Sequence, residues 1–214
     1  MPVFNPKVAL PMILSLVLAG CAREGELTAQ GITAVRSACP IVAIPAGTGD
    51  VTLFNPPTSR DASAIDVVAN ITNVRSTCDE TGENIVTTVT FEVQGQRRDA
   101  RGEREVVLPY FASVVQGGTN VVSKRVSNVG LRFTDGQHRA STSGGATGLV
   151  LRSAATLPED VRRQITRQRK AGDPDAALDP LADPAVRAAV QRATFELLVG
   201  FQLTEEQLRY NATR

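Results

Sequence analysis

An alternation of side chains between positions 85 and 94 constrains the fold more than any other feature. Successive side chains of a β-strand point to opposite faces, so such a segment buries one face and exposes the other. The face predicted to be buried carries Ile85, Thr87, Val89, Phe91 and Val93. Alternation with β-branched enrichment over ten residues predicts a half-buried strand.

Shorter runs with the same character recur along the chain, separated by segments rich in Pro, Gly and Asn. The turn-rich residues 79–84 join the runs 64–78 and 84–95, which predicts an antiparallel hairpin. Further strands are expected at 41–44, 50–54, 106–115, 121–126, 129–133 and 148–151. The sequence therefore predicts a mainly β fold, an antiparallel β-sandwich with an immunoglobulin- or fibronectin-like layout.

Helical signals interrupt this pattern late in the chain. Pro158 and two acidic residues begin a short segment that we expect to be helical until Gly172. Three Asp-Pro pairs then oppose helix over 173–184, and a helix can restart over 184–192. Residues 154–192 are thus predicted to be a helical excursion between two strands. Alternation returns over 195–203, and a Thr204–Gln207 capping box predicts a C-terminal helix.

The N-terminal segment is typical of a secretory signal. Lys7 precedes an apolar run over residues 8–18, which Pro11 interrupts and which is too short to span a bilayer. The run ends in Leu18, Ala19, Gly20 and Cys21. These four residues resemble the lipobox of bacterial lipoproteins. The alternative is an ordinary secretory peptide that happens to place a cysteine there.

The resemblance implies a division of the chain. Residues 1–20 would be a signal peptide in which Leu18, Ala19 and Gly20 are recognised for cleavage, and the Cys21 thiol would receive a diacylglycerol. Because Ala22 and not Asp follows, the resemblance implies the periplasmic face of the outer membrane rather than retention at the inner membrane. Residues 21–38 are polar and are expected to form a tether to a domain over 39–214.

Two cysteines remain after Cys21. In an oxidising periplasm, Cys39 and Cys78 are expected to form a disulfide, with two separately buried thiols as the alternative. Two cysteines and His138, the single histidine, do not make a four-ligand zinc set. We expect no metal and no cofactor.

Charge excludes one class of partner. Residues 1–20 contain Lys7 and no acidic residue, so 22 basic and 22 acidic residues remain without them, and a chain this balanced does not predict nucleic-acid binding. One local basic patch could contact anionic lipid headgroups: Arg162, Arg163, Arg167, Arg169 and Lys170. The alternative is a solvated helix balanced by the Asp-rich residues that follow it.

Catalytic candidates are weak. The glycine-rich residues 143–148 lack a following Lys-Ser/Thr and a helix, so they predict a hairpin turn or disordered loop and not a phosphate site. His138 lies in a predicted turn without a clear serine partner. Three carboxylate pairs have simpler roles at strand edges, turns or caps: Glu103/Glu105, Asp79/Glu80 and Glu205/Glu206. We do not expect an enzyme.

Two further segments, 108–111 (Leu-Pro-Tyr-Phe) and 200–210, resemble an uncharacterised group of alphaproteobacterial lipoproteins. This group implies no established activity. The leading hypothesis is a lipid-anchored, non-catalytic interaction or scaffold module with an envelope protein partner. The alternative is a periplasmic ligand-binding lipoprotein for a lipid, glycan or metabolite, although nine Phe and Tyr and no Trp argue against sugar stacking. A hydrolase ranks last.

Overall fold

A computed structural model describes residues 26–28, 31–33, 37–167, 172 and 178–213. The chain divides into two units, Met1–Val35 and Arg36–Arg214. In the first unit, β1 (Glu26–Thr28) and β2 (Gly31–Thr33) form an antiparallel hairpin in which Leu27 is opposite Ile32. The segment predicted to be a tether therefore contains a short hairpin, which its polar composition did not indicate.

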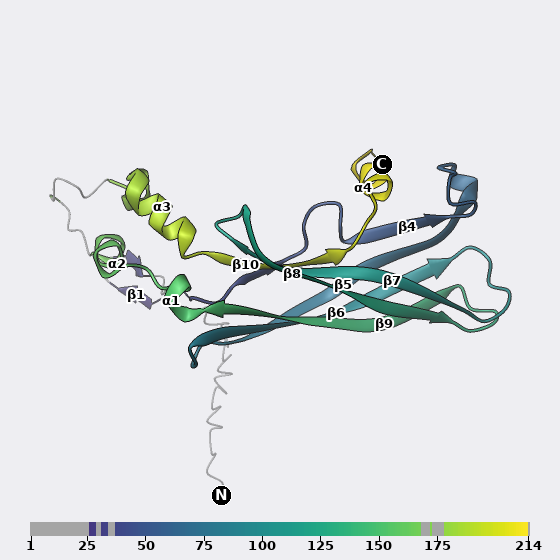
Figure 1. Cartoon of the computed structure of the whole chain (residues 1–214), viewed down its shortest axis with the longest axis horizontal. Helices are drawn as coiled ribbons and strands as arrows, with labels where there is room; N and C mark the ends of the chain where they lie inside the picture. The colour runs from purple at the N-terminus through teal and green to yellow at the C-terminus, as the bar shows by residue number, and fades with distance from the viewer. Residues whose placement is uncertain (1–25, 29–30, 34–36, 168–171, 173–177, 214) are drawn as a thin grey trace, which may run out of the picture. The chain divides into compact units, whose positions relative to one another are not determined.

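The second unit is a β-sandwich, as the sequence predicts. One sheet has the order β3-β10-β7-β8 and the other β4-β5-β6-β9 (Figure 1). The strands are β3 (Ile41–Ala43), β4 (Asp50–Phe54), β5 (Ile65–Asp79), β6 (Asn84–Arg97), β7 (Arg104–Gln116), β8 (Asn120–Phe133), β9 (Arg139–Leu151) and β10 (Phe195–Phe201). Within the described residues, each sheet thus has four strands, whereas a constant-type immunoglobulin domain has four and three.

The predicted hairpin forms between β5 and β6, which pair antiparallel. Along β6, the five residues of the predicted buried face are indeed buried. The four apolar ones pack against apolar residues of the opposite sheet, including Leu131, Phe133 and Leu197, in two core clusters. Burial of one face of each sheet is the main favourable contribution to such a fold.

The C-terminal segment also follows its prediction. Alternate residues of β10 are buried, and the strand pairs antiparallel with β7 and parallel with β3. The helix α4 (Glu205–Thr213) then begins with the capping box: the Gln207 amide donates to the Thr204 hydroxyl (3.2 Å) and the Thr204 amide donates to the Gln207 side chain (2.9 Å). α4 packs beside β4 (Figure 1).

Two predictions about strands were wrong. The runs 121–126 and 129–133 are parts of a single strand, β8, because both pair with β7 without a turn between them. The glycine-rich residues 143–148 are neither a turn nor a loop but the middle of β9, paired with β6. Gly144 lies so close to Phe91 that a Cβ there would be 2.5 Å from the ring, so the glycine provides space for an aromatic side chain.

The helical excursion lies between β9 and β10, as predicted. It contains α1 (Arg152–Ala155), α2 (Glu159–Thr166), a 3-10 turn η2 (Pro180–Ala182) and α3 (Pro184–Arg192). α2 ends at Thr166 and not at Gly172 as predicted. α3 begins at Pro184, and the Asp183 carboxylate accepts a hydrogen bond from the Ala185 amide.

Cys39 and Cys78 form the predicted disulfide, with sulfur atoms 2.07 Å apart. Cys39 lies two residues before β3 of one sheet, and Cys78 belongs to β5 of the other. The bond therefore connects the two sheets covalently.

Candidate functional site

The residues of the predicted lipid anchor, Leu18, Ala19, Gly20 and Cys21, lie outside the described residues. No helix in the part of the chain that the structure describes is long and apolar enough to cross a membrane. The anchor thus stays a prediction from the sequence.

The predicted basic patch is described only in part. Arg169 and Lys170 lie outside the described residues. Arg162 forms an ion pair with Glu159, one turn earlier in α2. This first cation is therefore already matched by an acid of its own helix.

Arg163 and Arg167 line a depression between α2 and η2. Asp179 and Asp183 line the same depression, so cations and acids face one surface. The arrangement favours the charge-balanced, solvated helix over a lipid-binding patch.

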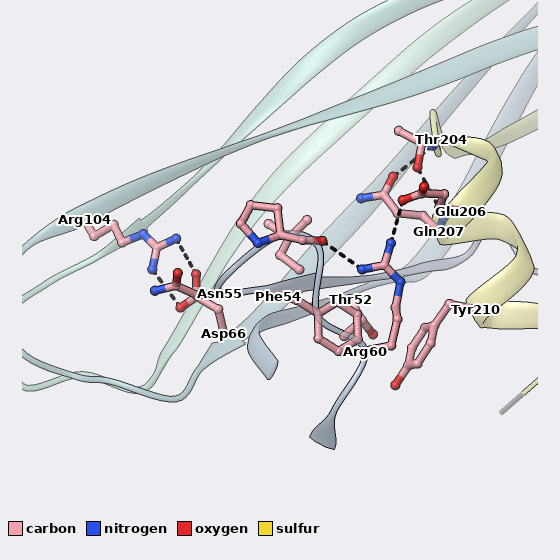
Figure 2. Close-up of a pocket in the computed structure, with 12 residues that line it drawn as sticks. Thr52, Phe54, Asn55, Arg60, Asp66, Arg104, Thr204, Glu206, Gln207 and Tyr210 are labelled. Atoms are coloured by element: carbon pink, nitrogen blue, oxygen red, sulfur yellow. Dashed lines mark hydrogen bonds and ion pairs between the residues drawn. The ribbon is translucent and has the colours of Figure 1, made fainter. Parts of the chain in front are cut away.

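A cleft of about 590 Å³ lies beside α4 (Figure 2). Its walls come from the end of β4, the loop that follows, the start of β7 and α4 itself. The charged and aromatic residues that line it are Phe54, Arg60, Asp66, Arg104, Glu206 and Tyr210. Its volume falls in the range of small-molecule sites.

Arg60 makes three hydrogen bonds within this cleft. Its guanidinium donates to the carbonyls of Pro57 (2.8 Å) and Ser59 (2.6 Å) and to the Glu206 carboxylate (2.7 Å). It also lies 5.2 Å from the centroid of the Phe54 ring. Arg60 thus fastens the loop after β4 to α4.

The Arg104 guanidinium is also paired. Two parallel hydrogen bonds of 2.9 and 2.7 Å join it to Asp66, and these bonds raise the pKa of the Arg104 guanidinium. Tyr210 packs edge-on against Phe54 at 5.1 Å between ring centroids. Both guanidinium groups of the cleft are therefore paired: Arg60 and Tyr210 hold α4 against β4 and its loop, and Arg104 joins β7 to β5.

The carboxylate pairs of the sequence also have structural partners. Glu103 and Glu105 flank Arg132, with nitrogen–oxygen distances of 3.9 and 3.8 Å. Asp79 accepts hydrogen bonds from the amide and hydroxyl of Thr81, which lower the pKa of the Asp79 carboxyl. The first pair lies at the start of β7, which is an inner strand and not the strand edge that was expected, whereas the second begins a turn as expected.

The remaining candidates fit the same pattern. Glu205 pairs with Arg209 at 2.9 Å within α4. The Nδ1 atom of His138 lies 3.1 Å from the backbone carbonyl of Arg97, and its ring is exposed. Across the described residues, no three His, Cys, Asp or Glu side chains are grouped to hold a metal ion.

The sequence did not reveal the most unusual surface, which is the first part of β8. β8 is the last strand of its sheet, and all nine of its residues 120–128 are exposed. On the neighbouring strand β7, by contrast, Tyr110 and Val114 are buried, and the Tyr110 hydroxyl donates to the Gly145 carbonyl of β9 (2.7 Å). The opposite sheet thus covers β7 but leaves this part of β8 uncovered on both faces.

We call residues 120–128 the β8 overhang. It exposes Val121, Val122 and Val126 by 58%, 53% and 54%. It also carries Lys124 and Arg125, and no carboxylate among the described residues lies within 4 Å of either. A β-branched run without alternation is the only sequence signal for such a strand.

No family model matches the chain, and neither a curated protein nor a solved structure is significantly similar to it.

Proposed function

We propose that this protein is a lipid-anchored, non-catalytic interaction module of the bacterial cell envelope. Its Cys21 carries the lipid, and the periplasmic face of the outer membrane holds the domain where it can bind a protein partner. The observation that carries the proposal is the β8 overhang, a strand edge left open on both faces.

An open edge supports a binding role for physical reasons. The last strand of a sheet presents unpaired N–H and C=O groups that can pair with another chain. Proteins usually keep such edges short or covered, but the overhang spans about 30 Å at 3.4 Å per residue. Its three exposed valines add apolar surface that a partner would remove from water.

The alternative, a periplasmic ligand-binding lipoprotein, draws support from the volume of the cleft beside α4. The two arginines of the cleft favour this alternative less, because both already pair with groups of the chain itself and not with a ligand. This alternative would be favoured over the interaction module if a ligand copurified with the wild-type protein and not with Tyr210→Ala.

A pull-down in mild detergent tests the proposal. The tagged, full-length protein and Cys21→Ala would be isolated in parallel from native envelope at equal amounts. We expect a stoichiometric partner with the first and less of that partner with the second, because the anchor restricts the domain to the membrane surface. A protein without any partner in both samples would contradict the proposal.

A further inference from the structure

We propose that the β8 overhang binds an extended, acidic segment of a partner protein, which adds a fifth strand to the β3-β10-β7-β8 sheet. This inference rests on the proposed function and specifies the partner's chemistry. Strand addition of this kind takes its affinity from main-chain hydrogen bonds and its specificity from side chains on alternate faces.

The geometry of the sandwich distinguishes this edge from the others. β9 also ends its sheet, but its alternate residues from Ala140 to Val150 are half-buried or buried. β3 has three residues and β4 five, and the part of β5 beyond β4 exposes only its last five residues in a row, so these edges are shorter. The overhang alone combines nine residues with two open faces, so an incoming strand could contact side chains on both.

The charge of the overhang selects the partner. Lys124 and Arg125 are consecutive in the strand, so their side chains point to opposite faces. The Lys124 ammonium lies 5.0 Å from the centroid of the Phe111 ring on one face. With no carboxylate near either cation in the described part of the chain, two adjacent acids on the added strand would complement both faces.

The exposed valines of the overhang indicate which residues the partner's segment should carry beside its acids. Val121 and Val122 precede the cations, and Val126 follows them. Because all three are more than half exposed, the matching segment should have apolar or β-branched residues on each side of its acids. An acidic strand with such flanks would fit, and an acidic coil without them would not.

A second copy of this chain is poorly suited to pair with the β8 overhang. In the antiparallel register that pairs the whole overhang with itself, Lys124 would lie opposite Lys124 of the other copy. Like charges directly opposite one another destabilise a sheet, and lysine on an exposed edge is a common protection against such pairing. Prevention of edge-to-edge pairing explains the lysine, but it does not explain the three exposed valines beside the cations.

Peptide binding tests the inference with the full-length, detergent-solubilised protein. The probe is a fluorescein-labelled peptide, Thr-Val-Thr-Asp-Glu-Val-Thr-Val, and its matched opposite replaces Asp-Glu with Lys-Lys. Anisotropy is recorded for wild type, for Lys124→Glu/Arg125→Glu and for Arg75→Glu/Arg139→Glu. The last variant makes the same change in net charge at two exposed cations of the other sheet.

We expect the acidic peptide to bind wild type and Arg75→Glu/Arg139→Glu alike, and the overhang variant at least tenfold more weakly. The Lys-Lys peptide should bind the overhang variant better than wild type, which also shows that this variant is folded. Equal binding of the acidic peptide to both variants, or binding to none of the proteins, would overturn the inference.

The same variants in the envelope pull-down separate the two proposals. If Lys124→Glu/Arg125→Glu is the only variant that loses the partner, the result supports both the interaction module and the overhang as its binding edge. A partner retained by this variant overturns the edge assignment and leaves the interaction module in place. If no protein form retains a partner, the proposed function fails as well.

Discussion

Arg97 shows at the scale of one residue how this sandwich tolerates a buried charge. It is 1% exposed, yet its guanidinium pairs with no carboxylate among the described residues. Instead it donates hydrogen bonds of 2.6–2.9 Å to four backbone carbonyls and lies 5.3 Å from the Phe133 ring centroid. The carbonyls belong to Ala100, Gly102, Thr134 and Gln137. One side chain thus joins the loop after β6 to the loop after β8.

We expect Arg97→Met to lower the free energy of unfolding by at least about 3 kcal/mol, because four backbone carbonyls lose their charged donor at once. Equilibrium urea unfolding measures this. Arg75→Met, at an exposed position of β5, should change stability by no more than about 0.5 kcal/mol. A loss below about 1 kcal/mol at Arg97 would contradict the structural role.

At the scale of elements, the sequence predicted the strands with one buried and one exposed face. β6 and β10 alternate clearly because each has one face in the core. The strand predicted at 148–151 is the end of β9, but residues 139–147 were missed because Gly144 acts through a contact with the distant Phe91 side chain, which the local sequence does not display. Residues 121–126 of β8 were predicted to be a strand, but their continuation into 129–133 was missed because both faces of residues 120–128 meet solvent, so no alternation joins the two runs.

The close approach of Gly144 to Phe91 predicts that Gly144→Ala destabilises the protein. The added Cβ would lie 2.5 and 2.6 Å from two atoms of the buried Phe91 ring, and such overpacking costs about 1–3 kcal/mol. Ser143→Ala, at the exposed neighbouring position, is the matched control. Thermal unfolding should separate the two variants, and equal midpoints would be inconsistent with a close glycine–aromatic contact.

The disulfide between the two sheets gives a second prediction at the scale of elements. Replacing both Cys39 and Cys78 by Ala should lower the free energy of unfolding by about 4 kcal/mol, the chain-entropy value for a loop of about 40 residues. Urea unfolding with and without reductant measures the effect. Reductant should destabilise wild type by a similar amount and leave the double variant unchanged; an equal loss in both would exclude the disulfide as the cause.

At the scale of the whole molecule, the predicted location of the protein and its proposed binding surface rest on different observations. The anchor is predicted from four consecutive residues, Leu18 to Cys21, which resemble a linear motif. The β8 overhang exists only because the two sheets cover unequal parts of β7 and β8. The cleft beside α4 likewise depends on long-range pairs such as Arg60–Glu206, which no local pattern could predict.

The central claim, that the overhang binds a partner at the membrane, is tested most directly by photo-cross-linking in native envelope. Benzoylphenylalanine would replace Val122 in the overhang or, as a control, Leu178, which is 64% exposed in the helical excursion. We predict a discrete cross-linked product from position 122, weaker in the Cys21→Ala background and absent from position 178. No product from position 122, or the same product from both positions, would contradict the claim.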